Sequence, residues 1–291
     1  MQLKYSLKKE WAQFSRTFRL WGIIIAALAT ALLYILMFKF TGAVFESMEQ
    51  MGEMSMSAAS GGNLFGDLGI NMEDMIAMYL DAGMMYSVVM SSICSIALLV
   101  IVLVLGSAAG GEQKKRAMIV PLCSGLNNKS YVLAKFIVYP ISVFVIIFLT
   151  ALLSGALCNA LFPNNKVGFD LVLLGSVLAG IYMMFAVSIF LSLGLCTSKP
   201  GIMAAIVYIG TTILQTVFIR FQLNDYNPFT LLNLISGEMF ANPDFSLADN
   251  AASIAVGVVI SLLISVLMCL LAIAVLNAKK INNQEEKKPE F

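Results

Sequence analysis

The sequence predicts an all-α integral membrane protein with six transmembrane helices. Hydrophobic residues make up 59% of the 291-residue chain, charged residues only 12%, and the mean hydropathy is +0.88. Soluble domains do not have such a composition. All acidic and basic residues lie outside six apolar runs, each long enough for the roughly 20 residues that a helix needs to cross a bilayer. Because backbone amides in hydrocarbon must be bonded within their own segment, these runs predict helices.

The six spans are distributed over the whole chain, so we expect a single transmembrane domain, residues 1–291. The first span is not a cleaved signal peptide, because a polar and amphipathic segment precedes it and no small-residue cleavage site follows. No internal repeat and no separate soluble domain is visible in the sequence. We expect the spans at about residues 20–38, 83–109, 136–161, 171–195, 201–219 and 251–277.

The distribution of charge predicts the orientation of the chain. With a cytoplasmic N-terminus, fifteen of the eighteen basic residues lie on the inner side, and only Lys39, Lys166 and Arg220 lie outside. Twelve of the seventeen acidic residues fall on the outer side. This asymmetry follows the positive-inside rule. We therefore expect a multi-pass protein of the cell (plasma) membrane with both termini cytoplasmic.

Residues 1–19 predict an N-terminal amphipathic elbow helix that lies in the inner headgroup layer. Its apolar side chains recur every three or four residues, and basic side chains fall between them. A simple membrane anchor explains this pattern at least as well as a docking surface does. The stripe consists of Leu3, Leu7, Trp11, Phe14 and Phe18.

The segment 41–81 is an outer segment rich in glycine, methionine and acidic residues. Met51, Met54 and Met56 resemble a thioether motif for Cu(I). Methionine is also a common apolar filler, and no histidine or cysteine accompanies these residues. We therefore predict no metal site. The whole chain lacks histidine, which excludes Ser-His and Cys-His catalysis and His-ligated zinc or haem.

Three further segments connect or follow the spans. The second span ends with Gly106 and Gly110, whose spacing of four allows close helix packing. Residues 112–131 predict a basic cytoplasmic loop with a short helix. Residues 222–250 predict an outer re-entrant element between spans five and six, because two Asn-Pro turn signals bracket a mildly apolar stretch. Residues 278–291 form a polar cytoplasmic tail.

The loop after the second span carries a family resemblance. Its residues read G-G-E-Q-K-K-R-A and then L-C-S-G-L-N-N-K-S-Y-V-L-A-K-F. This pattern resembles the coupling loop of the permease subunits of type-2 ABC exporters, in which an acidic residue and nearby basic residues precede a short coupling helix. The layout of elbow helix, six spans and outer re-entrant element is similar as well. The loop departs from the family by lacking its Leu-Leu-Ser-x-Pro run; Pro121 lies earlier.

The resemblance implies a half-transporter that works with a separate cytosolic ATPase. The chain has no phosphate-binding loop of its own, so it binds no cofactor, and ATP and Mg would belong to the partner. A second permease copy or a paralogue would complete the translocation path. The resemblance implies that the residues coupling the chain to the ATPase are Glu112, Lys114, Lys115, Arg116 and Lys129.

The translocation path is expected to be apolar, since the spans supply no charged residue. Such a wall suits an amphipathic peptide, such as a toxin or antimicrobial peptide similar to the phenol-soluble modulins, or a lipid-like molecule. No nucleic acid is expected as a partner, whereas membrane lipids are. Candidate path residues are Met184, Met203, Thr212 and Gln215.

Other classes of protein stay open. An ion-coupled secondary transporter needs a polar residue such as Arg220, Gln215 or Asn159 in a water-filled path, and its transport would persist without an ATPase. A membrane-embedded enzyme is disfavoured because the spans hold neither histidine nor acidic pairs. A non-transporting assembly subunit also fits six spans.

Overall fold

The computed structural model describes residues 2–56, 79–106, 108–109, 127–197, 199–221, 227–242 and 245–285. Within these ranges the chain is helical almost throughout and contains no β-strand; one isolated bridge joins Asp81 to Asn164. Six helices are long and apolar enough to cross a membrane. This confirms the predicted fold class of a helical, multi-pass membrane protein.

The six long helices extend beyond several of the expected bounds. The membrane-spanning stretches are Phe18–Val44, Ala82–Gly106, Asn128–Leu161, Phe169–Cys196, Gly201–Arg220 and Leu247–Ala278. They lie in helices α2 (Phe18–Met56), α4 (Ala82–Ser92) with η2 (Ile93–Ala97) and α5 (Leu98–Gly106), α8 (Asn128–Leu161), α9 (Phe169–Cys196), α10 (Pro200–Arg220) and α13 (Leu247–Glu285).

Two helix ends differ from the boundaries expected from hydropathy. Helix α2 continues to Met56, through the beginning of the outer segment 41–81, because good helix formers such as glutamate and methionine predominate there and no proline intervenes. Helix α8 begins at Asn128, because the Asn127 side chain accepts a hydrogen bond from the backbone N–H of Lys129 and so caps the helix. Charged residues end an apolar run without ending a helix.

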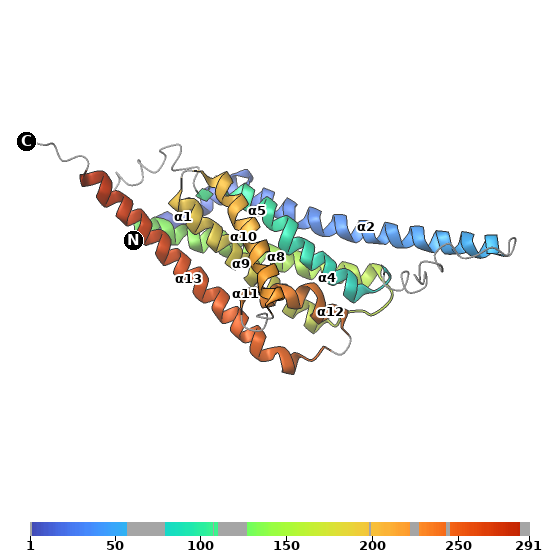
Figure 1. Cartoon of the computed structure of the whole chain (residues 1–291). Helices are drawn as coiled ribbons and strands as arrows, with labels where there is room; N and C mark the ends of the chain where they lie inside the picture. Colours follow the sequence, from blue (N-terminus) through green and yellow to red (C-terminus); the bar gives the residue numbers. More distant parts are fainter. Residues whose placement is uncertain are drawn as a thin grey trace, which may run out of the picture.

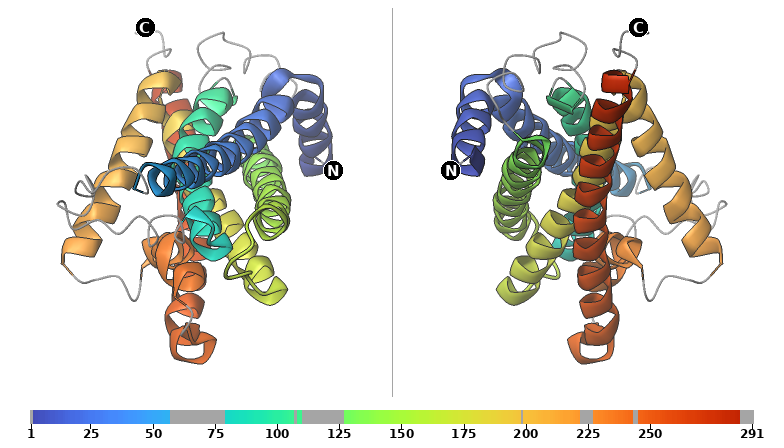
Figure 2. Two further views of the ribbon diagram at one scale, coloured as in Figure 1. Left: turned by 90° about the vertical axis from the view of Figure 1, so that its right-hand side faces the viewer. Right: turned by 90° about the vertical axis from the view of Figure 1, so that its left-hand side faces the viewer.

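The first and the last described helices each have one end at the same end of the helix bundle. Helix α1 (Gln2–Arg16) and the C-terminal end of α13 are at this end (Figure 1), which we call the terminal end. Helix α1 lies beside the beginning of α8, and α2 leaves it at an angle (Figure 2). The opposite end holds the short helices α11 (Pro228–Asn233), η5 (Leu234–Glu238) and α12 (Met239–Ala241).

Helix α9 is the centre of the bundle, whereas α10 and α13 lie at its edge. The most apolar window of α9 is 67% buried, compared with 17% for α10 and for α13. Small residues let neighbours approach α9 closely: a Cβ on Gly180 would lie 2.7 Å from the ring of Phe144 on α8. The outer faces of α10 and α13 expose isoleucine, leucine and valine, as a surface in contact with hydrocarbon requires.

Candidate functional site

A cluster of charged side chains is buried at the terminal end of the bundle. Glu10 of α1 and Lys135 and Tyr139 of α8 have no exposed surface, and Arg19 at the start of α2 is 8% exposed. Lys135 and Arg19 both lie in helices that are long and apolar enough to span the membrane. The cluster therefore connects the N-terminal helix to two spans.

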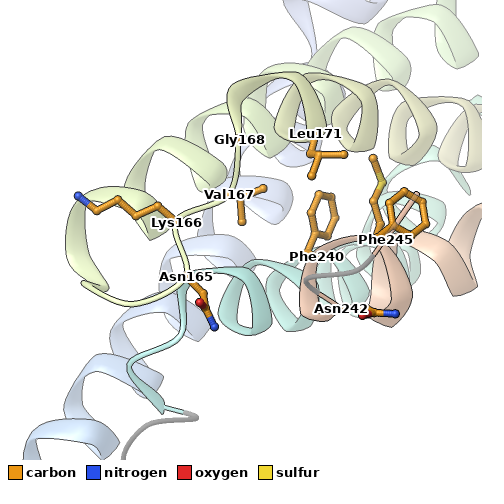
Figure 3. A pocket seen from close by; sticks show the side chains of 9 residues that line it. Asn165, Lys166, Val167, Gly168, Leu171, Phe240, Asn242 and Phe245 are labelled. Atoms are coloured by element: carbon orange, nitrogen blue, oxygen red, sulfur yellow. The ribbon is translucent and has the colours of Figure 1, made fainter. Parts of the chain in front are cut away.

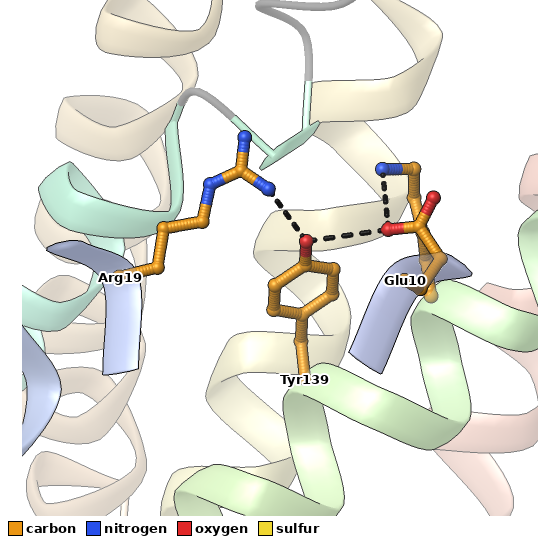
Figure 4. A network of polar contacts seen from close by, with 4 residues as sticks. Glu10, Arg19 and Tyr139 are labelled. Atoms are coloured by element: carbon orange, nitrogen blue, oxygen red, sulfur yellow. Dashed lines mark hydrogen bonds and ion pairs between the residues drawn. The ribbon is translucent and has the colours of Figure 1, made fainter. Parts of the chain in front are cut away.

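Hydrogen bonds run through the cluster in one chain (Figure 4). The Lys135 Nζ lies 3.2 Å from Glu10 Oε2, and the Tyr139 hydroxyl donates to the same oxygen at 3.3 Å. Arg19 Nη1 donates to the Tyr139 hydroxyl at 2.7 Å. The Lys135 ammonium also lies 4.9 Å from the centre of the Tyr131 ring, within the range of a cation–π contact. Tyr139 thus bridges the acid of α1 and the guanidinium of α2.

The local sequence explains why α1 turns this face inward. Ser6, Glu10 and Phe14 are spaced by four residues and form one buried face of α1. Phe14 packs edge-on against the ring of Tyr139, with ring centres 5.4 Å apart. The aromatic contact and the ion pair therefore hold α1 against the same helix, α8.

The predicted apolar stripe of α1 is only partly buried by this packing. Phe14 is fully buried and Leu7 packs partly buried against the core. Trp11 and Phe18 are 56% and 70% exposed. The face of α1 that packs against the bundle is centred on Ser6 and Glu10 and not on the apolar stripe. The aromatic side chains of Trp11 and Phe18 therefore stay on the surface.

Two polar atoms of the cluster have no hydrogen-bond partner among the described residues. They are Glu10 Oε1 and the Ser6 hydroxyl, and both are buried. A buried ion pair gains little net free energy, because desolvation offsets much of the Coulomb attraction, but removing one partner typically costs about 3–5 kcal/mol. Such a junction is sensitive to any change that separates α1 from α8.

Sequence reasoning does not identify this cluster. Lys135 directly precedes an apolar run and is one of the fifteen basic residues expected on the inner side, and no sequence pattern singles out Glu10. One signal was present: Tyr131, Lys135 and Tyr139 are spaced by four residues, so two tyrosines flank the lysine on one helix face. The absence of charge from the six apolar runs gave no indication of a buried ion pair.

The opposite end of the bundle contains a cavity of about 270 Å³ (Figure 3). Apolar side chains of α9, α12 and the following turn form one wall, among them Leu171, Phe240 and Phe245. The 165–168 turn forms the other wall, and the Lys166 side chain extends away from the cavity. The turn is held by Asn159, whose side-chain amide pairs with both the N–H and the carbonyl of Val167, each at 2.9 Å.

Asp81 joins this turn to the start of span two. Its Oδ1 accepts the Met84 backbone N–H at 3.0 Å and caps α4, and its Oδ2 accepts the Asn165 amide at 2.6 Å. Asn165 has a φ of 45°, a left-handed conformation that asparagine tolerates better than most residues. The loop between α8 and α9 is therefore fixed to α4 by hydrogen bonds.

Phe240 of α12 packs into a recess in the bundle. A Cβ on Gly83 of α4 would collide with the Phe240 carbonyl, and a Cβ on Gly175 of α9 would collide with its ring. Tyr86 packs against the ring with centres 4.5 Å apart. The Tyr86 hydroxyl lies 3.3 Å from the Ser176 hydroxyl and donates to the carbonyl of Ala151 at 3.2 Å. Phe240 thus fixes the short helices to α4 and α9.

The four candidate path residues occupy different environments. Met184 on α9 is half-buried, and Met203 on α10 packs partly buried against the core. Thr212 is exposed, and its hydroxyl donates to the Tyr208 carbonyl. Gln215 donates to the Asn233 side chain of α11 at 3.2 Å, so it joins α10 to the short helices.

The structure also shows the surroundings of the polar residues that a secondary carrier would need. Asn159 is engaged by the backbone of Val167, and Arg220 is exposed at the end of α10. Neither lines the cavity at the opposite end. A polar path through these side chains therefore has no support in the described part of the chain.

Most of the predicted coupling residues lie outside the described residues. This applies to Glu112, Lys114, Lys115, Arg116 and Gly110. Lys129 is exposed on the first turn of α8, and Gly106 is buried at the end of α5. In the described ranges no group of three or more acidic, cysteine or histidine side chains is arranged to hold a metal, and Cys94, Cys158, Cys196 and Cys269 are free.

Comparison with known proteins gave no relative: no protein-family model, no curated protein and no solved structure matches this chain. What the fold defines by itself is a multi-pass membrane protein of six apolar helices.

Proposed function

We propose that this chain is the permease subunit of an ATP-driven ABC exporter, which pairs with a second permease copy or a paralogue and with a separate cytosolic ATPase. The layout supports the proposal. An N-terminal helix, six spans and short helices between the last two spans occur in the order that the family resemblance implies, and α1 and the C-terminal end of α13 lie at one end of the bundle. We place both termini in the cytoplasm because of the charge asymmetry.

The observation that carries the proposal is the buried junction at the terminal end. Glu10 joins α1 to α8 through its ion pair, and the Tyr139 hydroxyl is hydrogen-bonded to both Glu10 and Arg19 of α2. A cytosolic partner that pushes on α1, or on the loop leading into α8 at Lys129, would move two spans together. Rigid helices that repack as units are a common basis of switching between two states.

The cargo that fits this proposal is an amphipathic peptide or a lipid-like molecule. The described spans contain few charged side chains; in the junction, Lys135 is paired with Glu10, and Arg19 donates to the Tyr139 hydroxyl. Candidate path residues from α9 and α10 are thioethers, a threonine and an amide, which contact an amphipathic surface without requiring an ionic partner.

The test uses the full chain co-expressed in turn with the soluble ABC ATPases of the same genome. We expect one of them to co-purify with the chain and proteoliposomes of that pair to move a labelled amphipathic helical peptide only with ATP. Glu112→Ala and the pair Lys115→Glu with Arg116→Glu should insert normally but lose ATPase binding and stimulated ATP turnover. Lys287→Glu, a charge reversal in the polar tail, is the matched control. Normal binding, turnover and transport in every variant would refute the role of the loop.

A second candidate function is an ion-coupled secondary transporter. The observation in its favour is the buried Glu10–Lys135 pair, whose lysine lies in a membrane-spanning helix, since buried ionisable residues often mark ion or proton pathways. The two functions separate in one experiment. Peptide movement that persists without any ATPase and stops when the ion gradient is collapsed identifies the carrier.

A further inference from the structure

An apolar groove runs along the outer surface of the bundle between α2 and the second span. Its volume is about 440 Å³, and α2 supplies one side from Phe18 to Tyr34. Ile96 of η2 and Val100 and Val104 of α5 supply the other side. Ile96 and Val100 are 41% and 38% exposed, so this wall is open to the surroundings. Both sides lie within membrane-spanning stretches, so the groove faces the bilayer.

The floor of the groove consists of small side chains. Gly22, Ala26, Ala29 and Thr30 line it, and the Thr30 hydroxyl donates to the Ala26 carbonyl at 2.7 Å. At Gly22 the two helices are so close that a Cβ would lie 3.0 Å from Val104. The groove is therefore a narrow apolar trough, and the threonine offers no unsatisfied donor to a ligand.

The length and the volume of the groove fit a hydrocarbon chain. The seventeen residues from Phe18 to Tyr34 span roughly 24 Å of helix between the first and the last Cα. An apolar cavity of about 150 Å³ holds one benzene molecule with its six carbon atoms, so the groove holds on the order of 15 carbon atoms, which is one acyl chain.

A positively charged side chain lies near the end of the groove that is closest to α1. Arg16 ends α1 and is exposed, and it lies two positions before Phe18, so the two Cα atoms are at most about 7.6 Å apart. The headgroup of a lipid whose chain lies in the groove would reach the membrane surface beside this guanidinium. Arginine binds phosphate through paired hydrogen bonds, and a negative headgroup adds further attraction.

We propose that this groove is a binding site for one acyl chain of an anionic phospholipid of the membrane leaflet, with the headgroup at Arg16. The site is independent of the proposed export function, because it depends only on the surface of α2 and α5. It predicts one tightly held lipid per chain, with a preference for phosphatidylglycerol over phosphatidylcholine that Arg16 supplies.

The first test is native mass spectrometry of the detergent-solubilised full chain with added phosphatidylglycerol or phosphatidylcholine. We expect one retained lipid and at least tenfold tighter binding of phosphatidylglycerol. Ala29→Leu fills the groove and should weaken that binding at least tenfold, whereas Ala156→Leu, on the exposed side of α8, should leave it unchanged. Arg16→Gln should abolish the headgroup preference, and Lys8→Gln on the same helix should not.

The second test locates the chain. Phosphatidylglycerol with a photoreactive group near the end of its acyl chain, reconstituted with the protein in vesicles, should label Leu33, Ile96 and Val100 several-fold more than Leu263 and Leu267, which are exposed on α13. Equal labelling of the two surfaces, or equal lipid retention by Ala29→Leu and Ala156→Leu, would overturn the proposal. So would disulfide formation between Val100→Cys residues of two chains, which would assign the groove to a second copy.

Discussion

The two ends of the bundle fasten their short helices by different physical means. At the terminal end, α1 is attached to α8 by a buried ion pair, Glu10 with Lys135, and by a hydroxyl that links to Arg19. At the opposite end, Phe240 of α12 fills a recess that Gly83 and Gly175 leave open, and hydrogen bonds from amides, without an ion pair among the described residues, hold the adjoining turn. One attachment depends on charge and the other on shape.

The difference matters because the two kinds of contact respond differently to change. An ion pair out of water is balanced between desolvation and attraction, so loss of one partner is far more damaging than loss of both. Removal of a ring from a close-fitting recess destabilises the fold in proportion to the volume of the cavity that is left. The comparison can therefore be tested with single and paired substitutions at each end.

The largest effect is expected from Lys135→Met. It leaves the Glu10 carboxylate buried without its cation, which should lower the free energy of unfolding by about 3–5 kcal/mol. The paired change Glu10→Leu with Lys135→Met should recover most of this loss. Lys129→Met, on the exposed first turn of the same helix, is the control. Equilibrium unfolding in mixed micelles measures all three; equal values for Lys135→Met and Lys129→Met would show that the pair does not stabilise the junction.

A somewhat smaller loss, about 3 kcal/mol, is expected from Phe240→Ala, because the recess between Gly83 and Gly175 is left empty. The same unfolding measurement applies, and Phe240→Leu should lie between the alanine variant and the parent. Phe221→Ala, whose ring is 69% exposed, provides the control. If both alanine variants unfold alike, the recess is not what fixes α12.

Asp81→Ala should cost about 1–2 kcal/mol, the usual range for loss of a helix N-cap, and it should also release the Asn165 amide. Asp81→Asn keeps an acceptor for the Met84 N–H and should retain most of the stability. Thermal unfolding of the three proteins gives the comparison. A larger loss for asparagine than for alanine would mean that capping is not the role of this residue.

The smallest effect is expected from Tyr86→Phe. The ring keeps its contact with Phe240, and only the hydroxyl bonds to Ser176 and Ala151 disappear. Hydrogen bonds between membrane helices contribute about 0.6 kcal/mol on average. A loss above about 2 kcal/mol in micelle unfolding would show instead that the hydroxyl is essential to the packing of α4, α8 and α9.

Hydropathy predicted the six-helix fold because length and composition alone decide which segments can cross a bilayer. Hydropathy could not predict where the helices end, because polar residues can continue a helix. Helix α2 continues past Lys39, and α8 begins before Lys135. At the opposite end, the Asn-Pro turn signal predicted a helix boundary better than hydropathy did. Asn227 caps α11 there by accepting hydrogen bonds from the backbone amides of Phe229 and Thr230.

The candidate site was harder to predict than the fold, because it depends on contacts between residues far apart in the sequence. Lys135 and Glu10 are separated by 125 positions, and nothing local to either residue specifies the other. The recess for Phe240 likewise requires Gly83 and Gly175 to meet in space. The coupling residues from Glu112 to Arg116, in contrast, came from a local motif and remain a prediction.

The π-helical turn Ile93–Ala97 determines where a membrane-spanning helix of this protein can lose a residue. A π-turn closes its hydrogen bonds over one more residue than an α-turn does. Losing a single residue there would leave an ordinary α-helix, with α4 still facing α8 and α5 still facing α10. The same deletion in α9 would rotate every later side chain by about 100° and turn its small residues away from their neighbours. We therefore expect the second span to tolerate a single-residue deletion at this turn that α9 would not tolerate.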